Sequence, residues 1–407
     1  MNLFIFFSAS ASVPYVDVPG LGVAFGALSS EDSSIAVFNG IRYATAPIGE
    51  RRWQSPTPAG PFVDALENAT EYGPICWQTP PHHGYNGTYT MSEDCLFLNV
   101  AGPVAALNGS KALPVAVWIH GGSYVSGSSN LYRNFAMASA AKGELIVVTL
   151  NYRLNTIGFL GSPAIASAAN GATGSAGNFG IEDQRAAMDW VKAHIAAFGG
   201  DAKRVTIFGE SAGGNSVLNH LAQPKSKGLF QRAIIESGVY SSGGRTMLDA
   251  TAQYNATLLA ASCDASASAA DQIACLRACN ASSLVEYSSL PPLGAMWLPV
   301  IDGVSMTKAP TDLIAEVRAP RLHWRLIGVS ACLPACGPQR MRCARCTPRS
   351  CFIRRVTLLT HARAPPRSRA RTLSRAPRRT TPRSQSCSAR IGTRWRTSTS
   401  TKGRRTT

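Results

Sequence analysis

A serine lies between two glycines in the stretch IFGESAGG, residues 207–214. Ser211 follows the apolar run VTIF, and Gly209, Glu210 and Gly213 complete the pattern Gly-x-Ser-x-Gly. In this pattern a strand ends in a turn too tight for neighbouring side chains, and the serine hydroxyl stands at the carboxyl edge of a sheet. A hydroxyl presented in this way is suited to nucleophilic attack on an acyl carbon. The alternative interpretation is a structural turn rich in small residues.

Backbone N–H groups near this serine could stabilise a negative charge on the oxygen of the attacked group. The following segment, SAGGNSVLNHLAQ, is predicted to form a helix, whose N-terminus carries free N–H groups and the positive end of the dipole. Upstream, IHGGSYVSG places Gly121 and Gly122 where the backbone can approach a reacting carbonyl closely. One such donor contributes roughly 3 kcal/mol in the transition state. Alone, this segment could be a glycine-rich strand end, but its combination with the serine motif favours catalysis.

Four apolar runs and a helical pattern predict the elements that must position these residues. Buried strands are expected at residues 114–119, 144–150, 205–208 and 232–235. A helix is expected between the second and third strands, because one face collects Ile181, Met188, Val191, Ile195 and Phe198. Gly199 and Gly200 are predicted to end it. Strands that alternate with helices indicate an α/β fold with a mostly parallel sheet and helices on both faces.

The basic charge of the chain is confined to its C-terminal part. The 407 residues have a formal net charge of +17, yet residues 319–407 contain 22 Lys and Arg and no Asp or Glu. Residues 1–318 therefore carry 18 basic and 23 acidic residues, a net charge of −5. Because the C-terminal part is rich in Arg, Pro, Ser and Thr without helical or strand period, we predict an Arg-rich disordered tail at 319–407. Our hypothesis for its abrupt start is a shifted reading frame or aberrant splicing.

Several signals indicate a secreted protein. Residues 1–11 are a candidate signal peptide, with an apolar patch followed by Ala-Ser-Ala, although the patch is short and a frayed N-terminus is the alternative. Five N-glycosylation sequons precede the tail, at Asn68, Asn86, Asn108, Asn255 and Asn280. No apolar run reaches the about 18 residues that a transmembrane helix needs. We therefore predict an extracellular glycoprotein without a transmembrane segment.

Seven segments, in order from about residue 36 to residue 303, resemble the type-B carboxylesterases, a family of carboxylesterases, lipases and cholinesterases with the α/β-hydrolase fold, and the resemblance as a whole covers about residues 36–318. They are FNGIRYATAPIGERRWQSP, SEDCLFLNV, WIHGGSY, NYRLNTIGFLG, GNFGIEDQRAAMDWVKAHIAAFGGDAKRVTIFGESAGG, LFQRAIIESG and WLPVIDG. The resemblance implies that residues 12–318 form the N-terminal part of an α/β-hydrolase domain, which is then C-terminally incomplete.

The resemblance also implies roles for individual residues. Ser211 would be the acylated nucleophile, and the N–H groups of Gly122, Ser123 and Ala212 would form the oxyanion hole. Ser123 replaces the third glycine of the family's Gly-Gly-Gly run, and a serine tolerates fewer backbone geometries than glycine. The implied reaction is hydrolysis of a small-molecule ester or lipid, without cofactor or metal.

The same resemblance implies two disulfides, Cys76 with Cys95 and Cys263 with Cys275. Each should contribute about 3 kcal/mol by loop closure. The loop between the first pair holds one tryptophan, Trp77, directly beside the cysteine. A cation–π site for choline, as in cholinesterases, is therefore not expected, and a general esterase or lipase fits better. The loop also contains His82 and His83, which are interpreted as a solvated pair rather than a metal site, and Cys279 is left unpaired.

The catalytic partners of the serine are not found in the sequence. A serine nucleophile needs a histidine base that a carboxylate orients, and in α/β-hydrolases both follow the serine along the chain. No Asp or Glu follows Glu316, and the histidines beyond the helix expected after Ser211 are His323 and His361. We therefore expect this chain to be impaired, although its family is enzymatic.

Two other functions stay open on the sequence alone. The first is a non-catalytic α/β-hydrolase-like protein that binds a partner. The second is nonspecific binding of nucleic acid by the Arg-rich tail. Because the tail has few aromatic residues and secretion is expected, no nucleic-acid partner is predicted. Zinc-like spacings in the tail are interpreted as accidental; they involve Cys332, Cys336, Cys343, Cys346 and Cys351.

Overall fold

The computed structural model describes residues 13–78, 89–169, 175–238, 244–289 and 297–316 and the strand Gly328–Val329. The predictions for the signal peptide at 1–11 and for the tail, apart from that strand, lie outside the described residues. The same holds for His82, His83, Asn86, His323, His361 and the tail cysteines. The other four sequon asparagines are exposed, and secretion stays a prediction. No helix among the described residues is long and apolar enough to cross a membrane.

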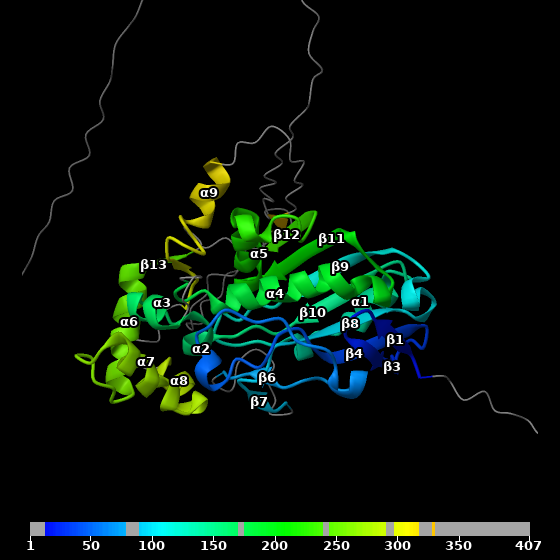
Figure 1. The fold of residues 1–407 in the computed structure, drawn as a ribbon. Coiled ribbons are helices and arrows are strands. Elements are labelled where there is room, and N and C mark those ends of the chain that lie inside the picture. The colour runs from blue at the N-terminus through cyan, green and yellow to red at the C-terminus, as the bar shows by residue number, and fades with distance from the viewer. Residues whose placement is uncertain are drawn as a thin grey trace, which may run out of the picture. The chain divides into compact units, whose positions relative to one another are not determined.

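An eight-stranded mixed sheet lies at the centre of the fold, in the order β15-β12-β11-β9-β10-β8-β4-β3 (Figure 1). Its parallel part confirms the four predicted strands. They are β9 (Leu113–Ile119), β10 (Ile146–Leu150), β11 (Gly200–Glu210) and β12 (Arg232–Glu236). Beyond β12 the short strand β15 (Gly328–Val329) pairs in parallel with Ile235 and Glu236.

The other part of the sheet is antiparallel and was not predicted. It consists of β8 (Phe97–Pro103), β4 (Ile35–Arg42) and β3 (Ala27–Leu28). A separate three-stranded sheet contains β1 (Tyr15–Val18), β2 (Gly22–Phe25) and β5 (Leu66–Asn68). Two short pairs complete the described strands: β6 (Ile75–Cys76) with β7 (Met91–Ser92), and β13 (Arg245–Thr246) with β14 (Val300–Ile301).

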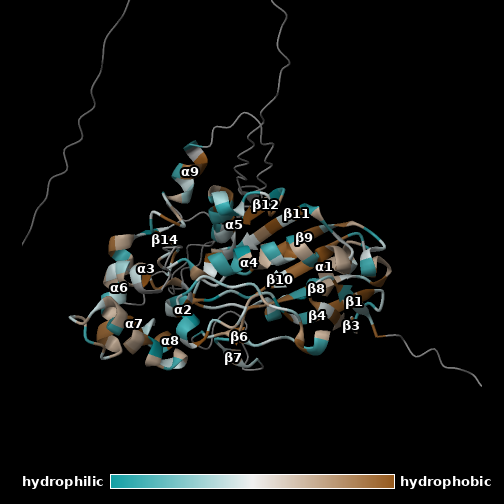
Figure 2. Ribbon diagram, in the orientation of Figure 1, coloured by the Kyte–Doolittle hydropathy of each residue, from teal (hydrophilic) through white to brown (hydrophobic). Residues whose placement is uncertain are grey.

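Helices cover both faces of the main sheet. Helices α4 (Phe179–His194) and α5 (Ala212–Ala222) lie on one face (Figure 1), and α1 (Asn134–Ala140) packs on the other. The hydropathy of the strands shows why both faces need cover (Figure 2). In β10, for example, Ile146 and Val148 join the larger core whereas Val147 joins the cluster under α1.

The predicted helix and its end are confirmed. The five apolar residues predicted for its inner face are at most 1% exposed. A 3-10 turn, Ile195–Phe198, follows α4, and Gly199 ends it in the left-handed conformation at φ +82°. The remaining 3-10 turns among the described residues are Gly49–Arg51, Val63–Ala65, Val104–Gly109, Ser129–Leu131 and Pro224–Ser226.

Five further helices gather at one end of the main sheet, at the left in Figure 1. They are α2 (Asn155–Phe159), α3 (Pro163–Ala169), α6 (Met247–Ala260), α7 (Ala269–Ala278) and α8 (Ala281–Tyr287). Helix α9 (Pro310–Glu316) contacts α5. Arg52 ties this group to the N-terminal part, because its guanidinium donates to the carbonyl oxygens of Leu276, Arg277 and Cys279 at the end of α7. The same guanidinium pairs with Glu93 at 2.7 Å.

Candidate active site

Ser211 lies at the junction of β11 and α5 in a conformation that few residues adopt. Its φ is +55° and its ψ is −120°, a region that is costly for a residue with a side chain. Two hydrogen bonds fix it: the Ser211 N–H donates to the Glu236 carbonyl at 2.9 Å, and its carbonyl accepts from the Asn215 N–H at 2.9 Å. The serine is thus held by the neighbouring strand β12 and by the first turn of α5.

The two glycines of the motif are required by space. A Cβ at Gly209 would lie 2.6 Å from the Ile119 carbonyl oxygen, and one at Gly213 would lie only 2.0 Å from the same atom. Strands β9 and β11 and helix α5 therefore meet backbone to backbone beneath Ser211. The Gly-x-Ser-x-Gly spacing follows directly from this contact.

Residues 121–127, here called the oxyanion loop, follow β9 and turn back on themselves. The N–H groups of Val125 and Ser126 both donate to the Gly122 carbonyl at 3.0 Å. Gly122 has a φ of +107° and Ser123 a φ of +56°. The serine that replaces a family glycine therefore does adopt the left-handed region, at a cost of about 1 kcal/mol.

The oxyanion loop lies directly beside the serine. A Cβ added to Gly121 would lie 3.2 Å from the Cβ of Ser211. Within the described residues, the N–H groups of Gly122 and Ser123 donate no hydrogen bond. Ala212 is the first residue of α5, so its N–H has no acceptor inside the helix. A hydroxyl next to such N–H donors is the arrangement that stabilises an oxyanion in acyl transfer.

Two residues that sequence analysis did not single out hold the oxyanion loop. The buried Tyr124, at φ +61°, places its hydroxyl 3.0 Å from the Asn215 Nδ2 and 3.2 Å from the Ser216 Oγ, which binds the loop to α5. Gln78 forms a reciprocal pair of hydrogen bonds with the backbone of Gly127. The only local signal for Gln78 is its position two residues after a predicted disulfide cysteine.

The described histidines have packing roles. His120 is stacked on Tyr152 with 4.2 Å between ring centroids, and burial lowers its pKa to about 4. His220, in α5, lies between Gln184 and Ser226 at 2.9 Å from each, and burial lowers its pKa to about 3. Burial also lowers the pKa of His194. Imidazoles with such low pKa values are weak bases at neutral pH.

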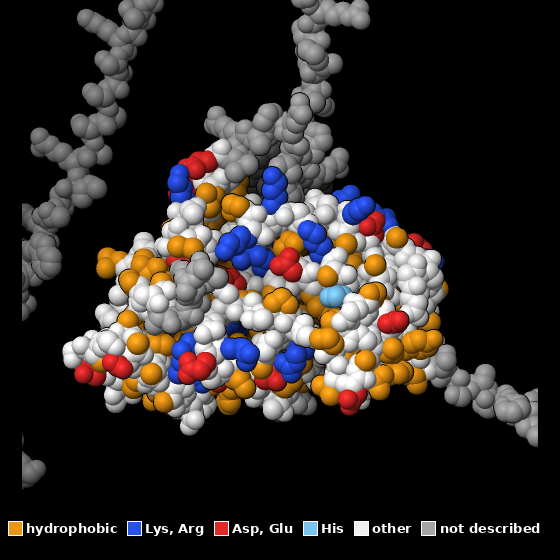
Figure 3. Space-filling model, viewed as in Figure 1, with side chains coloured by type: hydrophobic (Ala, Val, Ile, Leu, Met, Phe, Trp, Pro, Cys, Tyr) orange, Lys and Arg blue, Asp and Glu red, His pale blue; other side chains and the backbone are white. Residues whose placement is uncertain are grey.

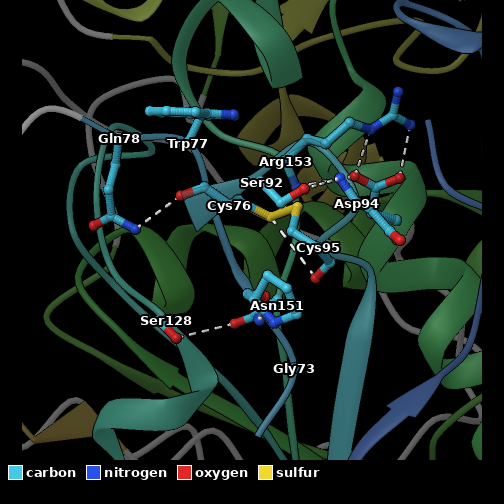
Figure 4. Close-up of a disulfide and its surroundings, with 12 residues drawn as sticks. Gly73, Cys76, Trp77, Gln78, Ser92, Asp94, Cys95, Ser128, Asn151 and Arg153 are labelled. Atoms are coloured by element: carbon cyan, nitrogen blue, oxygen red, sulfur yellow. Dashed lines mark hydrogen bonds and ion pairs between the residues drawn. A yellow bond between two sulfur atoms is a disulfide. The ribbon is translucent and has the colours of Figure 1, made fainter. Parts of the chain in front are cut away.

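Both disulfides implied by the family resemblance are formed in the structure. Cys76–Cys95 closes a loop of sequence separation 19 and Cys263–Cys275 one of separation 12. Cys279 is a partly exposed free thiol. The first disulfide lies close to Asn151 and Gln78 (Figure 4). Asn151 accepts a hydrogen bond from Ser128, just after the oxyanion loop, and Gln78 bonds to Gly127 at the end of the loop.

A separate cavity of about 410 Å³ lies on the outer side of α4. Both basic and acidic side chains lie on the face that Figure 3 shows. The cavity lining includes Tyr43, Glu182, Arg185, Asp189, His194 and Lys225. Neither the oxyanion loop nor Ser211 contributes to it, so we assign it no part in acyl chemistry. Among the described residues, no cluster of His, Cys, Asp and Glu could hold a metal ion.

Comparison with known proteins places this site in a family context. The sequence pattern of the carboxylesterase family matches residues 14–331, a longer stretch at both ends than the segments found by inspection. The chain is 46% identical over 213 residues to para-nitrobenzyl esterase of Bacillus subtilis, which covers 51% of this chain and 41% of that one. It is 38% identical over 305 residues to carboxylesterase 1C of Mus musculus, covering 71% and 52%. The chain spans about half the length of the curated relatives it matches.

A solved PNB esterase structure superposes on this chain with a TM-score of 0.66 and 33% identity, covering 78% of this chain and 63% of the other. The predicted α/β-hydrolase fold is therefore confirmed for the part of the chain that the structure describes.

Proposed function

Because the chain belongs to the carboxylesterase family, we propose that it is a serine hydrolase of carboxylic esters that forms an acyl-enzyme on Ser211. One observation carries the proposal: Ser211 holds a strained conformation at the end of β11, directly beside a loop in which the N–H groups of Gly122 and Ser123 donate to no acceptor among the described residues. That strain would serve no purpose in an ordinary turn, and such strain persists where the surrounding structure over-determines it.

The reaction has two steps, acylation of Ser211 and hydrolysis of the acyl-enzyme. The Ser211 Oγ attacks the ester carbonyl carbon while its proton passes to a solvent water molecule, and the resulting oxyanion accepts hydrogen bonds from the N–H groups of Gly122, Ser123 and Ala212. The tetrahedral intermediate then collapses, the alcohol leaves with a proton, and an acyl group remains on Ser211. Water attacks this acyl carbon in the same way, which releases the carboxylic acid and restores the hydroxyl.

We further propose that this chain turns over esters slowly. The support is that His120 and His220 are buried with other partners and have low pKa values, and that no Asp or Glu follows Glu316. In the well-studied serine hydrolases, loss of the histidine base alone costs roughly a million-fold in turnover.

Labelling and hydrolysis test the proposal together. The purified chain is incubated with a fluorophosphonate and with a p-nitrophenyl ester, and the labelled residue is identified by mass spectrometry. We expect slow labelling at Ser211, a very low rate of hydrolysis, and loss of both in Ser211→Ala. The exposed Ser33, which belongs to no glycosylation sequon, is the matched control, since Ser33→Ala should change neither. Hydrolysis that persists in Ser211→Ala would contradict the assignment of the nucleophile, and turnover at rates typical of carboxylesterases would contradict impairment.

A further inference from the structure

The oxyanion loop has a backbone that needs support from outside the loop. Four of its seven residues have positive φ values: Gly122, Ser123, Tyr124 and Gly127, at +107°, +56°, +61° and +110°. For Ser123 and Tyr124 this conformation persists only if surrounding contacts fix it. The N–H groups of Gly122 and Ser123 can serve an oxyanion only while the loop holds this shape, so the contacts that fix the loop matter for chemistry.

Gln78 supplies such a contact at the end of the loop. Its Nε2 donates to the Gly127 carbonyl at 3.0 Å, and its Oε1 accepts from the Gly127 N–H at 2.9 Å. The side-chain amide thus pairs with both backbone groups of one residue, as a neighbouring strand would. Gln78 is only 3% exposed, so water does not compete for these bonds.

Gly127 is also the point where the loop closes on its own beginning. A Cβ at Gly127 would lie 2.4 Å from the His120 Nδ1 and 2.5 Å from the Gly121 carbonyl oxygen. Gly127 therefore packs directly on the residues that lead into the loop, and Gly121 in turn lies against Ser211. A shift of Gly127 would move both ends of the segment that carries the N–H donors.

The Cys76–Cys95 disulfide holds Gln78 in place. Gln78 follows Cys76 by two residues, and its Nε2 also donates to the Cys76 carbonyl at 3.1 Å (Figure 4). Between them, the Trp77 carbonyl accepts a hydrogen bond from the Asn155 Nδ2 at 2.8 Å. The backbone of Gln78 is therefore held by the Cys76–Cys95 disulfide two residues before it. Its side chain is held by the hydrogen bonds to Gly127 in the oxyanion loop.

We propose that Gln78 is a positioning residue for the oxyanion hole, and that the Cys76–Cys95 disulfide acts on the acylation step through it. This inference rests on the proposed function, because it assumes that Ser211 is acylated. Gln78 does not touch the reacting atoms; it sets where the N–H groups of Gly122 and Ser123 point. Its loss should slow the chemical step and leave binding of the ester or phosphonate almost unchanged.

Gln78→Leu and a matched control test the role. Gln272 makes the same number of bonds in another part of the fold: its Nε2 donates to the carbonyl oxygens of Ala265 and Ala267 at 2.9 Å each, and its Oε1 accepts from the Tyr254 hydroxyl at 2.9 Å. The rate of fluorophosphonate labelling at Ser211 is measured against reagent concentration, which separates the labelling step from reagent binding. Hydrogen exchange of the peptide that contains residues 121–127 is measured on the same samples.

We expect Gln78→Leu to lower the maximal labelling rate at least about tenfold, with little change in the reagent binding constant, and to speed exchange in residues 121–127. Gln272→Leu should change neither, even where its melting temperature falls equally. Wild-type labelling and exchange in Gln78→Leu would overturn the proposal. If the wild-type chain is not labelled at Ser211 at all, the proposed function fails, and the exchange measurement alone decides the role of Gln78.

Gln78→Glu distinguishes positioning from a general structural role and covers the case in which the leucine variant fails to fold. A carboxylate can still accept from the Gly127 N–H but repels the carbonyl oxygens of Gly127 and Cys76, whereas a protonated carboxyl group can donate to one of them. The labelling rate of Gln78→Glu, relative to wild type, should therefore recover as the pH is lowered. A ratio that is the same at every pH would contradict the proposed hydrogen-bond role.

Discussion

The conformation of Ser211 depends on the absence of side chains at the positions that surround it. Gly213 faces the Ile119 carbonyl so closely that even a methyl group has no room. Gly209 meets the same oxygen from the other side of the turn. At the residue scale, the turn at Ser211 is thus a contact between three backbone segments, and the half-buried Ser211 is held at that contact.

Gly213→Ala tests this contact. Its Cβ would lie 2.0 Å from the Ile119 oxygen and 2.9 Å from the His120 oxygen, and neither backbone can give way without moving β9. We expect the free energy of unfolding to fall by at least about 3 kcal/mol, with loss of Ser211 labelling. Gly60→Ala is the control, because a Cβ there meets nothing within 4 Å, and it should change stability by no more than about 0.5 kcal/mol. Equal denaturation curves for the two variants would contradict the argument.

The residues that carry local patterns could be predicted, and those that act over long sequence distances could not. Ser211 and its glycines form a short motif after an apolar strand, so the turn could be recognised from the sequence. The hydrogen bonds between the side-chain amide of Gln78 and the backbone of Gly127 join residues that are 49 positions apart in the sequence. Such a bond leaves no periodicity or composition signal, and it becomes visible only when the fold brings the two segments together.

At the element scale, a buried ion pair joins the end of β10 to α4. Arg153 and Asp183 are both fully buried, and the guanidinium contacts the carboxylate at 2.8 and 2.7 Å while the Arg153 N–H donates to it at 3.0 Å. Because the strand and the helix are separated by a long connection, this pair fixes their relative position. The same helix packs against the sheet beside α5, so the pair supports the layer that carries the turn at Ser211.

Asp183→Asn should therefore be costly. It removes the charge that compensates a guanidinium with no access to water, and breaking such a buried pair costs about 3–5 kcal/mol. The exposed pair Arg204–Asp201, at 2.8 Å, is the control, and Asp201→Asn should cost at most about 1 kcal/mol. Urea denaturation of both variants measures the difference. A loss of similar size for both would show that burial does not decide the strength of these pairs.

The elements themselves were predictable in part. Four of the five parallel strands are short apolar runs separated by helical patterns, and these four were predicted; β15 lies in the stretch that was predicted to be disordered. Strands β4 and β8 are buried along nearly their whole length, so they show no alternation between apolar and polar residues. Their antiparallel pairing is decided by which edges the fold leaves open, which the local sequence does not specify.

At the scale of the whole molecule, the charge of the chain changes at an earlier residue than the one at which the family match ends. The acidic residues all precede residue 317, whereas most of the basic ones follow it. The carboxylesterase match nevertheless continues to residue 331, and β15 adds to the sheet at the outer edge of β12. The boundary at residue 318, predicted from composition, therefore does not coincide with the end of the family match.

The pH dependence of stability is a property of the whole molecule that two buried histidines should dominate above about pH 4. In the unfolded chain their pKa is about 6.5, whereas burial lowers the pKa of His120 to about 4 and that of His220 to about 3. Between these values the unfolded state binds more protons, so the free energy of unfolding rises with pH. The stabilisation is complete above about pH 6.5 and is lost as the pH falls toward the folded values, by on the order of 3 kcal/mol for each histidine.

Urea denaturation at a series of pH values between neutrality and pH 4 measures this loss. Glu67 and Asp189 act in the opposite sense, because burial raises their pKa values and protonation then favours the folded state, but only near the acid end of the range. His220→Gln removes one titrating group, so the slope of stability against pH should become shallower even if the variant is less stable at neutral pH. A slope equal to that of the wild type would mean that His220 is not held neutral by burial between Gln184 and Ser226.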